Sequence, residues 1–184
     1  MLDHVRPTYE NCSFQINFDG SLFPEDKYKI KFIKLFAVYE DIIYRFSMGN
    51  NSDYRESIDT YAYPIMLAMK AYDEDGLIEL LSNQKRYGIN FKTRNLDLIE
   101  FRTPNASSDP ITWQNYITFF YYLIQYSLSP KCNEKLLDEY IEEFNKIDLL
   151  DYYKKCNVEK AYQLSLKIFN NQTDKLNFLS QYIK

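Results

Sequence analysis

A glutamate and an arginine stand two positions apart in the stretch LIEFRTPN, residues 98–105. In an extended strand, side chains two positions apart project from the same face. Glu100 and Arg102 therefore share one face, while Ile99 and Phe101 share the other. A carboxylate can bind Mg²⁺ and a guanidinium can neutralise phosphate or carboxylate oxygens. The pair could therefore help to hold a metal-bound polyphosphate.

Two further segments alternate polar and apolar residues in the same way. They are CSFQINFD, residues 12–19, and RYGINFK, residues 86–92. We predict strands over both and over 97–103, with the last two strands forming a hairpin. If the three strands pair, the polar side of the sheet collects Gln15, Asn17, Arg86, Asn90, Lys92, Glu100 and Arg102.

The remaining segments carry helical patterns. Apolar residues recur at three- and four-residue steps over 24–48, and Gly49 is a natural C-cap. Pro64 begins a short helix to about Tyr72, and another runs from Asp75 to Leu81. The predicted C-terminal helices span 110–129, 136–144, 147–153, 158–169 and 173–183, with Asn157 and Thr173 as N-caps of the last two.

Strands followed by helices predict an α+β fold in a single domain over 1–184. A small antiparallel sheet with helices on one face occupies residues 9–109, and a helical region occupies 110–184. The tyrosine-rich stretch 116–126 is expected to be core, with a partner-binding surface as the alternative.

Composition narrows the function classes. The formal net charge of −4 argues against a protein that grips nucleic acid, and no run of 18 apolar residues offers a membrane span. The first residues show no secretory signal. Three widely spaced cysteines and a single histidine argue against a zinc site and against Cys–His or Ser–His catalysis. We expect a cytoplasmic protein with reduced thiols.

The stretch LIEFRTPNASSDP, followed by ITWQNYITFFYYLI, resembles the amidoligase family of glutamine-synthetase-like carboxylate–amine ligases. In that family a strand of the form (I/V)-E-x-R-x-x-(D/N) precedes a turn and a helix. NCSFQINFDGSLF is similar to an earlier strand of the family, and LFAVYEDIIYRFSMGNNSDYRESIDTYAYPI to its segment of helix, arginine and Y-x-x-P. The resemblance covers roughly residues 9–130 and rests on the order and spacing of these motifs.

The resemblance implies a role for each matching residue. Glu100 would be the metal-ligating glutamate, and Arg102 the catalytic arginine that holds the substrate carboxylate or the transferring phosphate. Arg86 lies near the position where the family has another phosphate-binding arginine, so the resemblance implies a catalytic role for it as well. It also implies ATP or substrate binding by Gln15, Asn17 and Arg55.

The implied reaction is ATP- and Mg²⁺-dependent amide formation. A small-molecule or peptide carboxylate would take the γ-phosphate to give an acyl phosphate, and an amine would then displace phosphate. Protein groups would supply positioning and charge neutralisation rather than a covalent nucleophile.

Two departures from the family pattern matter. Gln15 stands where the family usually has a histidine, and no E-x-E strand precedes Cys12. The chain is therefore expected to be a truncated form, a degenerate relative, or half of a split enzyme whose N-terminal half is on another chain. The alternatives are a non-catalytic helical interaction module derived from the same fold, or an unrelated α+β protein whose Glu100–Arg102 pair faces water.

Overall fold

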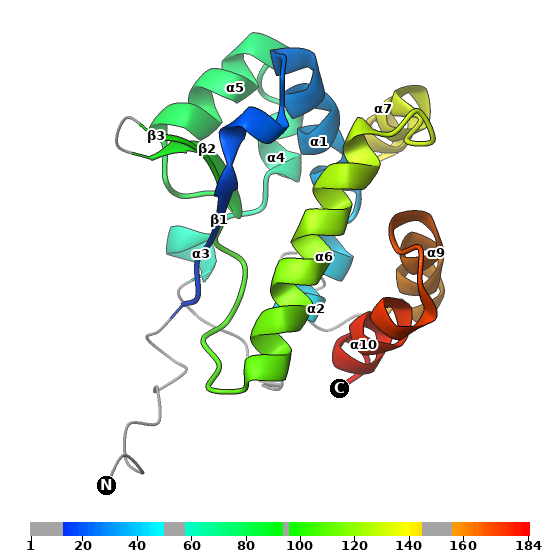
Figure 1. Ribbon diagram of the computed structural model, residues 1–184. Helices are drawn as coiled ribbons and strands as arrows, with labels where there is room; N and C mark the ends of the chain where they lie inside the picture. Colours follow the sequence, from blue (N-terminus) through cyan, green and yellow to red (C-terminus); the bar gives the residue numbers. More distant parts are fainter. Residues whose placement is uncertain (1–12, 50–57, 94–95, 145–155) are drawn as a thin grey trace, which may run out of the picture.

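The structure is a computed structural model, and it describes residues 13–49, 58–93, 96–144 and 156–184 (Figure 1). Within these residues three antiparallel strands form a small sheet, and helices make up most of the rest. The predicted α+β fold is therefore confirmed. No helix of the described part is long and apolar enough to cross a membrane.

The strands are β1 (Ile16–Asp19), β2 (Ile89–Thr93) and β3 (Leu96–Phe101), in the order β1-β3-β2. The predicted hairpin is confirmed as β2–β3, and β3 is the central strand. All three strands are shorter than expected at one end. Ser13 forms only an isolated bridge with Asn105, and β3 ends at Phe101.

The strand register places like residues side by side. Phe101 lies opposite Ile16 on one neighbour and Ile89 on the other, whereas Glu100 lies opposite Asn17 and Asn90. Because side chains alternate along a strand, each row of three residues shares one face of the sheet. The sheet thus has an apolar row and a polar row, as the alternation predicts.

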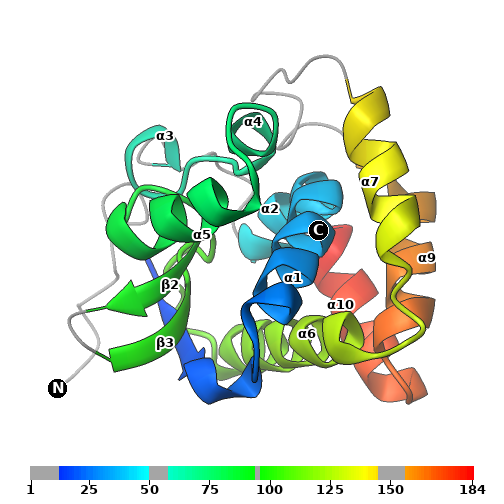
Figure 2. The same ribbon diagram turned by 90° about the horizontal axis from the view of Figure 1, so that it is seen from above.

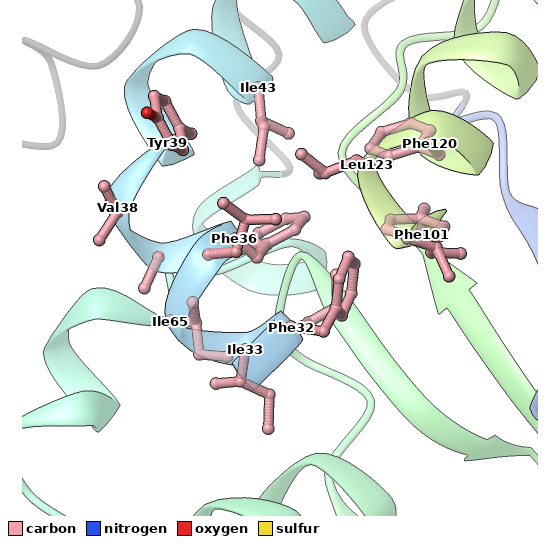
Figure 3. Packing of buried hydrophobic residues seen from close by; sticks show 14 of the residues in the cluster. Phe32, Ile33, Phe36, Val38, Tyr39, Ile43, Ile65, Phe101, Phe120 and Leu123 are labelled. Atoms are coloured by element: carbon pink, nitrogen blue, oxygen red, sulfur yellow. The ribbon is translucent and has the colours of Figure 1, made fainter. Parts of the chain in front are cut away.

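Helices α1 (Asp26–Val38) and α6 (Pro110–Leu128) cover the apolar row. The ring of Phe101 stacks on Phe120 of α6, with centroids 4.1 Å apart, and meets Phe32 of α1 edge-on at 5.9 Å (Figure 3). Phe36 packs beside them, and all four side chains are fully buried. This aromatic cluster joins sheet and helices into one core.

The predicted single helix over 24–48 is wrong, because the chain bends at Tyr39 and continues as α2 (Glu40–Ser47). The apolar spacing runs unchanged across the bend, so the sequence pattern cannot reveal it. At the bend the carbonyl of Val38 accepts a hydrogen bond from Lys160 Nζ at 2.8 Å, and Asp41 Oδ1 accepts another at 2.7 Å. Gly49, just after α2, has the positive φ of 65° expected of a helix-ending glycine.

Three short helices precede the hairpin: α3 (Ile58–Tyr61), α4 (Met66–Met69) and α5 (Glu74–Asn83). The helix predicted from Pro64 to Tyr72 is wrong in extent, because only one turn forms. The helix predicted over 75–81 is confirmed as α5, and α5 packs against β2. Tyr63 pairs with Tyr87 in a parallel bridge next to β2.

The C-terminal part consists of α7 (Glu134–Glu143), α9 (Val158–Ile168) and α10 (Gln172–Tyr182). Helices α9 and α10 lie beside α6, on the side away from the sheet (Figures 1 and 2). Asn157 caps α9 as predicted. The predicted Thr173 cap is wrong, because the side chain of Asn171 accepts from the Asp174 N–H instead. The helix predicted over 147–153 lies outside the described residues.

A single lysine ties three helices together. Nζ of Lys34, on α1, lies 2.9 Å from Glu74 of α5, 2.8 Å from Glu134 of α7 and 3.0 Å from Asp138 of α7. Burial by itself would lower the pKa of Lys34, but hydrogen bonds to the three carboxylates raise it well above the usual range. The ammonium therefore stays charged and holds α5 and α7 against α1.

We expect the Lys34→Met variant to lose about 1–3 kcal/mol of unfolding free energy, because three neighbouring carboxylates would remain without their cation. Urea denaturation measures this loss. The matched control is Lys135→Met on α7, where the lysine is largely exposed and lies 3.8 Å from Glu139. A loss at Lys34 no larger than at Lys135 would contradict this role.

Candidate functional site

Glu100 lies at the middle of the sheet, on its central strand and opposite Asn17 and Asn90. Its side chain is only 6% exposed, and the side chain of Arg102 is 12% exposed. Asn90 is completely buried. Glu100, Arg102 and Asn90 are therefore largely shielded from water, whereas Asn17 in the same row is exposed. The alternative of a solvent-facing Glu100–Arg102 pair is wrong.

Both carboxylate oxygens of Glu100 accept hydrogen bonds. Oε2 lies 3.1 Å from Asn90 Nδ2 and 3.2 Å from Arg102 Nη1. With the Gln15 amide turned to suit both neighbours, its nitrogen donates to Glu100 Oε1 at 3.0 Å and its oxygen accepts from Arg102 Nη1 at 3.1 Å. One carboxylate is thus held by three donor side chains, from β2, from the segment before β1 and from Arg102 just after β3.

Arg102 links this cluster to a distant segment. Its Nε donates to the carbonyl of Tyr61, at the end of α3, at 2.7 Å. Its backbone N–H donates to the carbonyl of Gly88, just before β2, at 2.8 Å. The guanidinium therefore lies between the Glu100 carboxylate and the C-terminal end of a short helix, two places where negative charge collects.

The structure brings together four of the residues in the predicted polar set: Gln15, Asn90, Glu100 and Arg102. Asn17 lies beside Glu100 by register, but its exposed side chain makes no hydrogen bond among the described residues.

Arg86 does not join this cluster in the described structure. The side chain of Arg86 is exposed and forms no ion pair with a described residue, while its carbonyl accepts from the Tyr63 N–H. Lys92 lies opposite Asp97 in the hairpin. Arg55 falls outside the described residues. The roles that the resemblance implies for Arg86 and Arg55 therefore stay predictions.

Sequence reasoning missed a second buried carboxylate, Glu40. It is fully buried and accepts hydrogen bonds from the backbone N–H groups of Ile65 and Met66, which it holds at the start of α4. Its position was a usable signal, because it stands four residues after Phe36 and three before Ile43 on the apolar stripe. A charged residue at such a position is buried with partners or not at all.

The cluster around Glu100 does not fit a magnesium ion. Mg²⁺ prefers six oxygen ligands in an octahedron, usually with one or two carboxylates. Glu100 supplies the only carboxylate that the described residues bring to this cluster, both of its oxygens accept N–H donors, and a guanidinium lies 3.2 Å away. The buried Asn90 Oδ1, which has no partner, would add one neutral oxygen. The described residues contain no group of three Asp, Glu, His or Cys side chains suited to a metal.

Comparison with known proteins gives no family. No protein-family model matches the sequence. Searches of curated proteins and of solved structures likewise find no match. The resemblance to amidoligases therefore stays a prediction that rests on the quoted motifs.

We expect Glu100→Gln to lower the unfolding free energy by about 2–4 kcal/mol, because the largely buried Arg102 loses the Glu100 carboxylate. The new amide would also turn N–H groups toward Asn90 or Gln15. Urea denaturation measures the change, and the exposed Glu142→Gln should stay within about 0.5 kcal/mol of the wild type. Higher stability in Glu100→Gln, as expected when a carboxylate kept for a metal is neutralised, would contradict a structural role.

Proposed function

We propose that this chain is a non-catalytic interaction module on an amidoligase-like α+β scaffold. The observation that carries the proposal is that both oxygens of the Glu100 carboxylate already accept hydrogen bonds, from Asn90, Arg102 and Gln15. In this arrangement the residue that the resemblance assigns to the metal has a structural role.

The energetics of the buried pair support this proposal. Breaking a buried ion pair by removing one partner typically costs about 3–5 kcal/mol, because a desolvated charge remains. A metal ion that took the Glu100 carboxylate would have to break its bonds to Arg102 and Asn90 while lying close to the guanidinium. The free energy of breaking these bonds would weaken metal binding at this site.

Exposed apolar side chains support a role in binding a partner. Trp113, Ile117 and Tyr121 follow one another at four-residue steps on α6, so they lie along one flank of the helix. A second row on α9 consists of Val158, Tyr162 and Leu166. Isolated exposed apolar residues are common, but contiguous rows mark surfaces that bind other molecules. The alternative of a partner-binding role for the tyrosine-rich helix thus gains support.

One observation favours a second candidate, the ATP-dependent carboxylate–amine ligase. Gln15, Glu100 and Arg102 converge at the centre of the sheet, as the resemblance implies. In this candidate, another chain would supply further carboxylates, and the two chains together would bind ATP, Mg²⁺ and the carboxylate and amine substrates. A cytoplasmic location belongs to both candidates.

Isothermal titration calorimetry of the chain with ATP, with and without Mg²⁺, tests the choice. The interaction-module proposal predicts no Mg²⁺-dependent heat of ATP binding. Mg²⁺-dependent binding in the wild type that disappears in Glu100→Gln, with the folded state of the variant verified by circular dichroism, would overturn the proposal and favour the ligase.

A further inference from the structure

Strand β1 is an edge of the sheet. It pairs with β3 on one side, and no other described strand pairs with it on its second side. Alternate N–H and C=O groups of an edge strand point outward and can pair with a further strand. The opposite edge is different, because α5 packs on β2 and Tyr63 bridges to Tyr87 beside it. The β1 edge is therefore the side at which the sheet can grow.

The exposed flank of α6 lies next to this edge. The rings of Phe14, which leads into β1, and Trp113 are stacked, with centroids 5.6 Å apart and planes 6° apart. Ile117 and Tyr121 continue the same flank and are 47% and 43% exposed. The chain leading into β1 thus meets the exposed flank of α6 at Phe14 and Trp113. We call the outer edge of β1 together with this flank the β1–α6 face.

The β1–α6 face is uncharged in an acidic chain. Helix α6 contains no Asp, Glu, Lys or Arg over its 19 residues, and residues 14–18 contain none either. Asp19 stands at the end of β1. With a formal net charge of −4 per chain, two copies repel each other in general, and a neutral face is where they meet at the lowest electrostatic cost.

We propose that the β1–α6 face binds the same face of a second copy of this chain. The proposal rests on the proposed function, because it names the partner of the interaction module. Two β1 strands would pair antiparallel about a twofold axis and extend the antiparallel sheet without a break. Such an interface is isologous, so each element meets its own copy.

The geometry suits this arrangement. With the axis at Asn17, Asp19 of one copy lies opposite Gln15 of the other, so the two carboxylates are kept apart. Helix α6 contacts the segment before β1, through Phe14, and β3, through Phe101. With the helix axis of α6 above the gap between β1 and β3, the two α6 helices of the dimer would lie roughly 10 Å apart, given strand spacings of about 4.8 Å. Packed helices lie about 8–10 Å apart, so the two exposed flanks would meet.

Analytical ultracentrifugation over the micromolar range tests the proposal. The wild type is expected to sediment as a concentration-dependent dimer. Ile117→Glu, an exposed change, should weaken the dimer by roughly tenfold or more, because two carboxylates would face each other across the axis. Ile117→Lys should do the same, and an equimolar mixture of the two variants should restore the dimer.

The matched control is Leu166→Glu on α9, where the side chain is 45% exposed. It should dimerise like the wild type. A wild type that stays monomeric, a dimer that survives Ile117→Glu, or a dimer lost in Leu166→Glu would each overturn the proposal. A monomeric chain that also shows no Mg²⁺-dependent ATP binding would leave the interaction module standing with another surface, so the two failures are distinguishable.

Discussion

The buried ion pair between Glu100 and Arg102 is the constraint on which the rest of the sheet depends. A carboxylate at the middle of the central strand is tolerated only if every oxygen is satisfied. Asn90 from β2 and Gln15 from the segment before β1 supply donors, and Arg102 supplies the charge. Because a slip of one residue would turn these donors to the other face, the pair also fixes the strand register.

The sequence pattern was sufficient to predict which face of the sheet each residue occupies, but not to predict which of these residues are buried. Alternation alone placed Glu100 and Arg102 on the face opposite Phe101, and the hairpin followed from the short spacing between two such strands. Burial of the Glu100–Arg102 pair could not be predicted, because it depends on contacts such as that of the distant Tyr61 carbonyl with Arg102. The bend at Tyr39 was invisible because the apolar stripe continues through it.

Several charged side chains stabilise the packing of the fold, whereas the surface proposed to bind a partner is uncharged. The cations Lys34 and Lys160 hold helices together through carboxylates and carbonyls, and Arg102 does the same for the sheet. These charges are used inside the fold. The β1–α6 face carries none over α6 and lies along an open strand edge, so the surface best suited to a partner is apolar rather than electrostatic. The residue types of the sequence point to the polar side chains of the sheet, whereas the structure points to the open edge of β1 as the binding surface.

A double-mutant cycle on Glu100 and Arg102 tests the central claim most directly. We predict that Glu100→Leu and Arg102→Leu each lower the unfolding free energy by about 3–5 kcal/mol, since each removes one member of a largely buried ion pair. The double variant should recover a large part of the loss, because two apolar side chains can replace a buried pair at little cost. Single variants as stable as the wild type, with effects that simply add, would contradict the claim that this pair is structural.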